Sequence, residues 1–331
     1  MPDRPLTLEA PDVQAQLPTL RVGLSRVGVT GVEKVIRIRQ HGAEQLFWAR
    51  LDCFVDLAGD QKGAHMSRFE EVVNEAIGSV VLGEATFRAE DLAQRIAELV
   101  RDRQGALRAE VTIAARYPEH KPAPVSGIDT QEIYTLYGMA LASERGTRRL
   151  VGVAAQGMTA CPCAQQLIGA SARARLLEQG FGEEEIEGIF EAVPLATHNQ
   201  RGLGTLHVGA TESGTLEIDA RTLLEIVENS MSSEIYELMK RVDEVAVVEK
   251  AHRRPRFVED CVREMIHGAL ERLPALPDDA FVSARQENLE TIHQHNVAAE
   301  RHGTLGELRR ELAGEDRPRH HTTLREWLDA V

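Results

Sequence analysis

The 331-residue sequence has few aromatic residues and fewer basic than acidic side chains. Aromatic residues make up 4% of the chain, and 38 lysines and arginines stand against 52 aspartates and glutamates, which gives a formal net charge of −14. A protein that binds nucleic-acid polymers needs a basic surface to displace counterions from phosphates. The sequence has no run of five or six basic residues, so the composition argues against a nucleic-acid partner.

Long apolar segments and a disulfide framework are missing as well. No apolar run approaches the roughly 18–20 residues that cross a bilayer, and the first residues lack the basic and apolar regions of a secretory signal. Four cysteines, Cys53, Cys161, Cys163 and Cys261, are too few to staple a chain of this length. We therefore expect a globular cytoplasmic protein of about two domains with no membrane partner.

The first half of the chain contains patterns of both strands and helices. Its first thirty residues hold four prolines and little periodicity, which predicts an irregular arm. Ser67 and Glu70 form a potential capping box ahead of a helix whose apolar positions continue to Val80, and a second helix is predicted over 89–103. Polar and apolar residues alternate in segments that predict strands, the first two joined as a hairpin: 32–40, 46–57, 107–117 and 131–144.

The second half repeats this order of elements more loosely, with no residue-level repeat. Strands are predicted near 149–158, 204–212 and 280–288, and helices near 220–240 and 257–272. A partly helical insert occupies about 164–196, and an amphipathic helix follows Gly303. Strands in antiparallel-looking pairs and helices in pairs predict an α+β protein with domains at 1–146 and 147–331. Oligomerisation would cover its sheet edges.

Several polar segments could carry chemistry. Cys161-Pro-Cys163 follows a predicted strand, where a thiolate is either a soft metal ligand or a nucleophile, although free cysteines are as often buried packing residues. The segment from Ala196 to Gly202 has five consecutive polar side chains, which are costly to bury without partners. His293 and His295 would share a face if they lay on a strand.

Two further groupings suggest ligands without establishing them. Lys62, His65 and Arg68 surround a predicted helix N-terminus, an arrangement that suits a phosphate, and an ordinary basic loop is an equal alternative. One cysteine, one histidine and one carboxylate could together form a metal site with an open position for water. Because these residues are far apart in the sequence, their spacing cannot show that they meet.

Six segments together resemble one enzyme family: KGAHMSRFEE, TACPCAQ, THNQRG, ELMKRVDE, FVEDCVRE and NLETIHQH. In this order, between about residues 10 and 300, they resemble GTP cyclohydrolase type IB, and more closely the archaeal-type enzymes of the methanopterin pathway, which share the long insert. The resemblance implies a tunnelling fold (T-fold) of two tandem ββααββ modules with antiparallel sheets and helices on one face. It also implies homotetramers with sites at subunit interfaces.

The implied reaction opens the imidazole ring of GTP, releases C8 as formate and forms a 7,8-dihydroneopterin phosphate for folate or methanopterin synthesis. The resemblance implies that Cys161, His198 and Glu244 hold one divalent metal ion, Fe²⁺, Zn²⁺ or Mn²⁺. It assigns Glu259 to the guanine edge and Glu290 and His293 to catalysis, with Cys161 counted among the catalytic residues. Lys62, His65, Arg68, Arg201 and Arg241 are candidates for the triphosphate, and the parts played by Cys163 and His295 stay open.

Alternatives remain at this point. The insert favours the methanopterin branch, but the product could keep its triphosphate or end as a 2′,3′-cyclic phosphate. A different T-fold enzyme would use Cys161 or Cys163 as a covalent nucleophile on a deazapurine nitrile, with NADPH and no metal. A non-enzymatic assembly module would instead use the cysteine, histidine and glutamate as a closed structural metal site.

Overall fold

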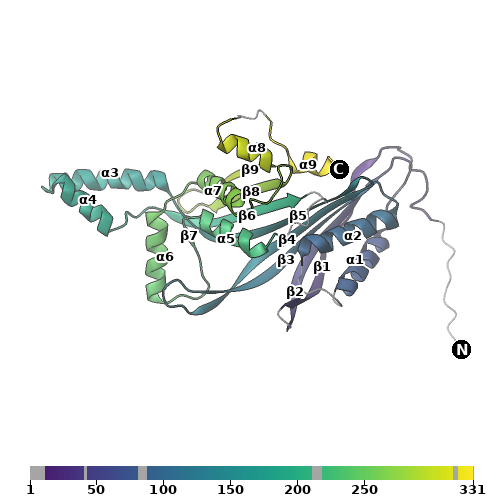
Figure 1. Cartoon of the computed structure of the whole chain (residues 1–331), viewed down its shortest axis with the longest axis horizontal. Coiled ribbons are helices and arrows are strands. Elements are labelled where there is room, and N and C mark those ends of the chain that lie inside the picture. Colours follow the sequence, from purple (N-terminus) through teal and green to yellow (C-terminus); the bar gives the residue numbers. More distant parts are fainter. Residues whose placement is uncertain (1–11, 41–42, 81–87, 211–217, 316–319, 331) are drawn as a thin grey trace. The chain divides into compact units, whose positions relative to one another are not determined.

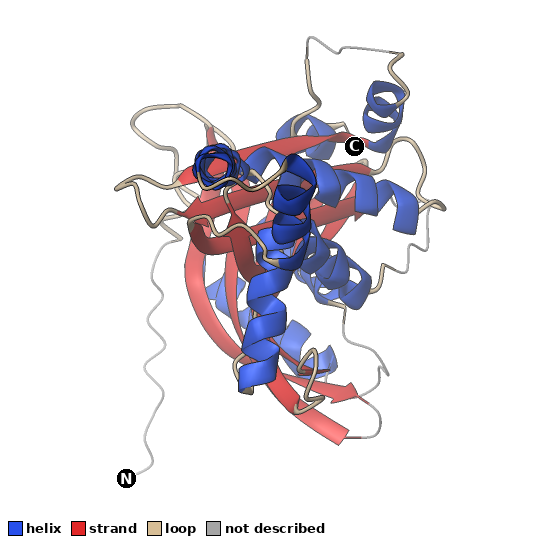
Figure 2. Cartoon of the chain, turned by 90° about the vertical axis from the view of Figure 1, so that its left-hand side faces the viewer, coloured by secondary structure: helices blue, strands red, loops and turns tan. Residues whose placement is uncertain are grey.

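The computed structural model describes residues 12–40, 43–80, 88–210, 218–315 and 320–330. Figure 2, with helices in blue and strands in red, shows that the chain mixes both kinds of element. In the described part the strands form an antiparallel sheet in the order β1-β2-β3-β4-β5-β6-β8-β9, and the short β7 pairs with β5. The predicted α+β class and the doubled ββααββ order are confirmed, with the two helices of the insert between β5 and β6.

The chain divides into two compact units. Unit 1 comprises residues up to Ile113 together with Met139–Thr147, and unit 2 comprises Ala114–Gly138 and Arg148 onward. This division assigns Ala114–Gly138 to unit 2 and Met139–Thr147 to unit 1. It therefore does not test the module boundary predicted at 146/147, which stays a prediction. Each unit is described separately below.

Unit 1 contains a long hairpin and two helices. Its elements are β1 (Leu24–Gln40), β2 (Ala43–Leu57), α1 (Met66–Val80), α2 (Ala89–Gln104), the start of β3 (Arg108–Pro122) and the end of β4 (Asp129–Ser143). Alternate side chains of β2 are buried, including Phe47, Leu51 and Val55, while Trp48 on the other face is exposed. The period-two prediction for this strand is therefore confirmed.

Two local predictions for the first half of the chain are wrong: the length of the irregular arm and the capping box of Ser67 with Glu70. β1 begins at Leu24, so the irregular arm is shorter than thirty residues, and its part before residue 12 lies outside the described residues. α1 begins at Met66, which places Ser67 inside the first turn instead of at the N-cap. Glu70 therefore cannot complete a capping box, and its carboxylate accepts a hydrogen bond from Lys34 at 2.9 Å instead.

Unit 2 holds the second sheet segment with its helices. Its strands are the end of β3, the start of β4, β5 (Gly146–Ala160, from Arg148), β6 (Asn199–Ala210), β7 (Ser233–Glu234), β8 (Phe281–Leu289) and β9 (Val297–Thr304). Its helices are α3 (Pro162–Glu178), α4 (Glu183–Ala192), α5 (Ala220–Ser230), α6 (Arg241–Arg253), α7 (Val258–Arg272), α8 (Leu305–Leu312) and α9 (Leu324–Asp329). The short link predicted at 41–44 falls partly outside the described residues. The same holds for the end of the strand predicted at 204–212.

Helices α5 and α7 pack against each other and on the strands of unit 2 (Figure 1). The buried residues of α7 recur at helical spacing, Val258, Cys261, Val262, Met265, Ile266 and Ala269, which is the amphipathic pattern of a helix that covers a sheet. α3 and α4 form the insert and contact each other. Only Gly169 and Ile186 are buried in these two helices.

The single helix predicted over 220–240 is wrong. α5 ends at Ser230, and the chain turns into β7, where Ser233 pairs with Met158 of β5. The backbone N–H of Ala160 donates to the hydroxyl of Ser232 at 3.1 Å, and the N–H of Glu237 donates to Glu132 at 2.9 Å. These bonds replace those of a continuous helix, and serine favours such breaks because its hydroxyl competes for backbone groups.

No helix in the described ranges is long and apolar enough to cross a lipid bilayer.

A half-buried histidine of unit 2 is packed against a glycine. His207 of β6 lies opposite Gly152 of β5, and a Cβ added at Gly152 would be 2.3 Å from the imidazole ring. The ring of Tyr137 is 5.2 Å away. Burial lowers the pKa of His207 to about 4, so the folded protein holds this side chain neutral.

We expect His207 to make the free energy of unfolding depend on pH. Its folded pKa lies below the value of about 6.5 in an unfolded chain, so its contribution is complete above pH 6.5 and is lost as the pH falls toward 4. Between pH 7.5 and 4.5 the loss should be about 2–3 kcal/mol. Urea unfolding of wild type and His207→Gln at both pH values measures it, and equal pH dependence in the two proteins would contradict the assignment.

Candidate active site

Two of the residues predicted from the sequence, Cys161 and His198, lie side by side where β5 ends and β6 begins. The paired strands finish at Ala160 opposite Asn199, and the next residue continues the ladder, because the N–H of Cys161 donates to the carbonyl of His198 at 3.2 Å. The hydroxyl of Thr197 donates to the carbonyl of Cys161 at 3.0 Å. The structure therefore brings Cys161 and His198 together although the whole insert lies between them in the sequence.

Cys161 also forms the N-terminus of α3. It is the N-cap residue, its Sγ accepts a hydrogen bond from the N–H of Ala164 at 3.4 Å, and Pro162 opens the helix. Unpaired N–H groups at a helix start favour negative charge on a nearby atom. Cys163 is exposed in the first turn of the same helix. Of the two cysteines, Cys161 is the one next to His198.

His198 and Glu290 form the buried part of the site. Nδ1 of His198 lies 3.8 Å from Oε2 of Glu290, and their side chains are 14% and 6% exposed. Nδ1 of His198 is buried and has no hydrogen-bond partner among the described residues. Buried ring nitrogens in proteins are almost always paired, so this atom is available to a ligand that the chain itself does not supply.

Strand alternation decides which neighbours face this site. Thr159 lies opposite Gln200, and Gly202 lies opposite both Gly157 and Asn288, so these side-chain positions share one face of the sheet. Arg201 lies one residue out of phase, on the other face, where its guanidinium donates to Gln156 at 2.6 Å. The structure therefore separates Arg201 from the face that continues toward Cys161 and His198.

The histidine pair after β8 is in a loop. β8 ends at Leu289 and β9 begins at Val297, so His293 and His295 do not lie on a strand. Their rings still stack, with centroids 5.2 Å apart and planes 13° from parallel, and both residues are exposed. The hydroxyl of Thr291 donates to the carbonyl of Asn199 at 3.1 Å, which ties this loop to the start of β6.

The first turn of α6 contains an acidic pair with opposite environments. Asp243 is fully buried and accepts hydrogen bonds from Val125 N–H, Ser126 N–H and hydroxyl, and Lys240 N–H at 2.6–2.9 Å. Burial alone would raise the pKa of Asp243, but these donors hold it well below its ordinary value. Glu244, the predicted metal ligand, and Arg241 are both exposed.

Glu244 does not reach Cys161 and His198 within one chain. Eight residues of α6, a rise of about 12 Å, separate it from His252, whose Nε2 lies 3.3 Å from the carbonyl of Thr197. Among the described residues no group of three histidine, cysteine, aspartate or glutamate side chains is placed to hold a metal ion. Cys161 and His198, two of the three predicted metal donors, therefore lie together. The third, Glu244, lies eight residues from His252 along α6, a distance of about 12 Å.

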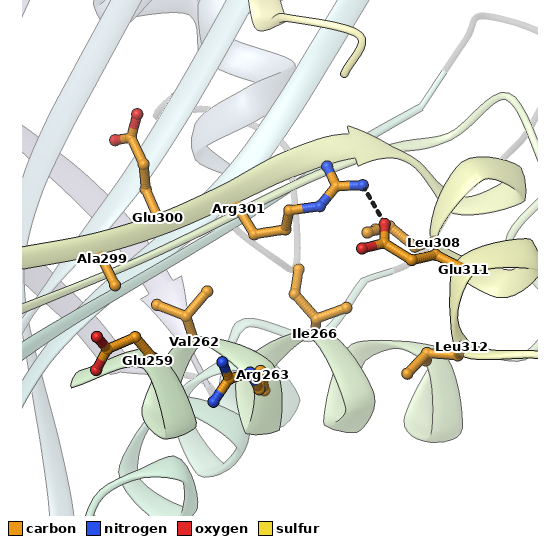
Figure 3. A pocket seen from close by; sticks show the side chains of 10 residues that line it. All are labelled: Glu259, Val262, Arg263, Ile266, Ala299, Glu300, Arg301, Leu308, Glu311 and Leu312. Atoms are coloured by element: carbon orange, nitrogen blue, oxygen red, sulfur yellow. Dashed lines mark hydrogen bonds and ion pairs between the residues drawn. The ribbon is translucent and has the colours of Figure 1, made fainter. Parts of the chain in front are cut away.

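Glu259 lies at a separate pocket of about 280 Å³ (Figure 3). It is exposed in the first turn of α7. The pocket lies between α7, β9 and α8, with apolar side chains such as Val262, Ile266 and Leu308, and it is closed at one end by the ion pair of Arg301 with Glu311 at 2.7 Å. Its described lining includes neither Cys161 nor His198.

The phosphate candidates of unit 1 already have partners in part. His65 Nε2 lies 3.0 Å from the carboxylate of Asp12, and the guanidinium of Arg68 donates to the carbonyl of Arg103 at 3.1 Å. The N–H of Ala15 and then His65 lower the pKa of Asp12. Lys62 is exposed at the edge of this group.

The sequence did not reveal three buried polar residues on the site's face of the sheet: Thr159, Gln286 and Asn288. Gln286 and Asn288 were detectable in principle. They lie on the same face of β8 as the buried residues Val282 and Ala284, at positions where the period-two pattern predicts apolar side chains. A polar side chain in a core position needs a partner, and that is the signal that could have found them.

We expect the acidic neighbours on α6 to separate stability from activity. Asp243→Ala leaves three backbone N–H groups without their acceptor and should lower the melting temperature by several degrees. Glu244→Ala removes an exposed side chain and should leave the melting temperature within about one degree. Differential scanning calorimetry of both variants tests this, and equal melting temperatures would contradict the buried role of Asp243.

Comparisons with known proteins agree over most of the chain. The sequence model of type I GTP cyclohydrolase folE2 matches residues 10–299. GTP cyclohydrolase MptA of Methanococcus aeolicus is 42% identical over 307 residues, which cover 91% of this chain and 99% of the relative. The MptA proteins of Methanococcus maripaludis strain C5 and Haloarcula marismortui are each 41% identical, covering 92% and 93% of this chain and 98% and 99% of the relatives.

The solved structures that match the chain include uricases at very low sequence identity. The uricase of Arthrobacter globiformis gives a TM-score of 0.49 at 8% identity, covering 86% of this chain and 94% of that one. A uricase of Bacillus fastidious gives 0.46 at 10% identity, with 90% and 98% covered. The sequence relatives, at about 40% identity along nine-tenths of the chain, decide the family. The chain belongs to the type I GTP cyclohydrolase folE2 family of enzymes.

Proposed function

We propose that this enzyme is a metal-dependent GTP cyclohydrolase that acts in the cytoplasm. It hydrolyses the imidazole ring of GTP, releases C8 as formate and forms a 7,8-dihydroneopterin phosphate. The observation that carries the proposal is the meeting of Cys161, His198 and Glu290 from three separate motifs at the ends of β5, β6 and β8. The family match and the name GTP cyclohydrolase of the MptA relatives supply the substrate.

The donor set fits a divalent metal ion in part. His198 has a buried Nδ1 without a partner among the described residues, and Cys161 offers a sulfur beside it. Cys161, His198 and Glu244 would hold the ion, and this mixed set of sulfur, nitrogen and oxygen suits Fe²⁺, Zn²⁺ or Mn²⁺. A bound divalent ion supplies an activated water at neutral pH.

The remaining acid–base work falls to the chain's own side chains. The carboxylate of Glu290 lies 3.8 Å from Nδ1 of His198, so it borders the place that the ion would take and can accept or donate a proton there. His293 is exposed in the loop after β8 and is the candidate that moves a proton to and from the guanine ring, because an imidazole can both donate and accept a proton. In this assignment Glu290 and His293 are the two acid–base groups.

Recognition of guanine is assigned to Glu259. A carboxylate can accept two hydrogen bonds from the N1 and 2-amino hydrogens of guanine, a donor pair that adenine lacks. Glu259 is exposed in the first turn of α7, where its carboxylate is free to meet a ligand. The candidates for the phosphates are Lys62, His65, Arg68 and Arg241. Of these, Lys62 and Arg241 are exposed and accessible to a ligand. Arg201 is the weaker candidate because it lies on the other face of the sheet.

Glu244 is proposed to enter the site from a second copy of the chain. Its distance along α6 from His252 keeps it from the Cys161–His198 pair of its own chain, and it is exposed. The homotetramer implied by the family resemblance would provide such a copy. The insert of α3 and α4 starts at Cys161 itself and favours the methanopterin branch, in which the product is the 2′,3′-cyclic phosphate.

The first test measures turnover. The metal-loaded enzyme incubated with GTP should release formate and a fluorescent pterin after oxidation. Cys161→Ala and His198→Ala should each lower kcat at least 100-fold, because each removes a donor that the others cannot replace. Cys163→Ala is the matched control and should keep most of the activity, since Cys163 is exposed and points from the helix surface.

Full activity of Cys161→Ala, or full activity after thorough chelation, would contradict the metal assignment. Loss of activity in Cys163→Ala with retention in Cys161→Ala would move the ligand to Cys163. Mass spectrometry of the product distinguishes the triphosphate from the cyclic phosphate.

A second test concerns the origin of Glu244. Cys161→Ala and Glu244→Ala should each be inactive alone. When the two variants are mixed under conditions that exchange subunits, activity should return in part, because mixed assemblies contain some sites with both donors intact. A mixture that stays inactive, although mass spectrometry shows mixed assemblies, would place Glu244 and Cys161 of one chain in the same site.

A further inference from the structure

A row of polar positions continues from the site into the interior of unit 2. Arg201 pairs with Leu289 and Gly202 with Asn288, so the antiparallel register places Gln200 opposite Glu290. Gln200 also lies opposite Thr159 on its other side. Directly opposite side chains in antiparallel strands have Cβ atoms about 4.5–5.5 Å apart. Thr159, Gln200 and Glu290 therefore form one row across β5, β6 and the end of β8.

In the next rows on the same face, three positions of β5 and β6 are glycines and carry no side chain. Gly157 and Gly202 lie beside Asn288, and Gly204 lies beside Gln286. A Cβ at Gly202 would be 2.5 Å from Nε2 of Gln286, and one at Gly157 would be 2.6 Å from Cε of Met231. The glycines thus make room under α5 for the side chains of Gln286, Asn288 and Met231, and two of these three are polar.

This region contains oxygen atoms whose hydrogen-bond capacity is unused. Thr159 Oγ1, Gln200 Oε1, Ser233 Oγ and Gln286 Oε1 are buried, and none has a partner among the described residues. Gln286 is fully buried and donates to Asn288 at 3.0 Å, which leaves its own oxygen free. Ser233 pairs with Met158 of β5, so its side chain lies on the other face of the sheet. The other three atoms lie together on the site's face, which is more than ordinary packing leaves unpaired.

Glu290 is a buried carboxylate that also needs a hydrogen-bond partner. Its side chain is 6% exposed, and Nδ1 of His198 is 3.8 Å away, beyond hydrogen-bond distance. A buried polar group without a direct hydrogen bond is commonly satisfied by water. Thr159 and Gln200 are the polar side chains in the same row, and both can donate as well as accept.

We propose that Thr159 and Gln200 are positioning residues that hold ordered water between the strands and, through it, fix Glu290 against His198. Buried water in proteins makes two to four hydrogen bonds to groups that otherwise lack partners, and the hydroxyl of Thr159, the amide of Gln200 and the carboxylate of Glu290 supply that number. Gln286 extends the wet region under α5. The effect on turnover rests on the proposed function, whereas the water itself does not.

The first experiment is a crystal structure of the wild-type enzyme at a resolution that shows ordered water. Water bonded to Thr159 Oγ1 and to Gln200 is the expected result. Side chains that instead satisfy one another directly, with no water between Thr159, Gln200 and Glu290, would overturn the proposal whether or not the protein turns over GTP.

The second experiment compares Thr159→Val, which keeps the shape and removes the hydroxyl, with Thr159→Ser, which keeps the hydroxyl. Thr159→Val should lower kcat for formate release at least tenfold with KM for GTP unchanged within twofold, and Thr159→Ser should restore most of kcat. Thr147→Val is the matched control: Thr147 lies at the other end of β5, is also buried, and donates to Glu98 at 3.0 Å. It should keep the wild-type kcat.

The outcomes separate the two proposals. Wild-type kcat in Thr159→Val, or an equal loss in Thr159→Ser, would overturn the positioning role. If Thr159→Val does not fold, Gln200→Met gives the same measurement with a side chain of similar length. A wild-type enzyme that releases no formate from GTP would refute the proposed function and leave the crystallographic test of the water standing.

Discussion

The antiparallel pairing of β5 with β6, and of β6 with β8, is the constraint on which the rest of the site depends. A register shift of one residue would move every side chain to the opposite face of the sheet. The observed register ends with Ala160 opposite Asn199, so the residues that follow and precede the strands, Cys161 and His198, emerge side by side. The same register brings Glu290 to His198 and sends Arg201 to the other face.

The insert between these strands can be long without disturbing this arrangement. Its first residue is fixed twice, as the end of the β5 ladder and as the N-cap of α3. Its return is fixed by the hydroxyl of Thr197 on Cys161 and by Gln165, whose amide donates to the carbonyls of Leu195 and His252 at 2.8 and 2.6 Å. Because both ends are held close together, the length of the helices between them does not change how Cys161 and His198 meet.

Adjacent acidic residues on α6 show how burial separates structural from functional side chains. Asp243 receives four hydrogen bonds and fastens the helix start to the segment around Ser126, while Glu244 is exposed and available. In the sequence both are members of one acidic motif. The difference between them arises only from the direction in which each leaves the helix, about 100° apart per residue.

The sequence by itself determined the class of fold, most of the strands and helices and the family, because period-two and helical patterns report on burial and several separated motifs occur in a fixed order. It missed α6 and β9. It could not place the break between α5 and β7, since the bonds of Ser232 and Glu237 that cause it come from distant strands. The tertiary structure alone decided which motif residues meet. Cys161, His198 and Glu290 meet through strand register, whereas Glu244 is held a helix length away, and neither relation is encoded in spacing along the chain.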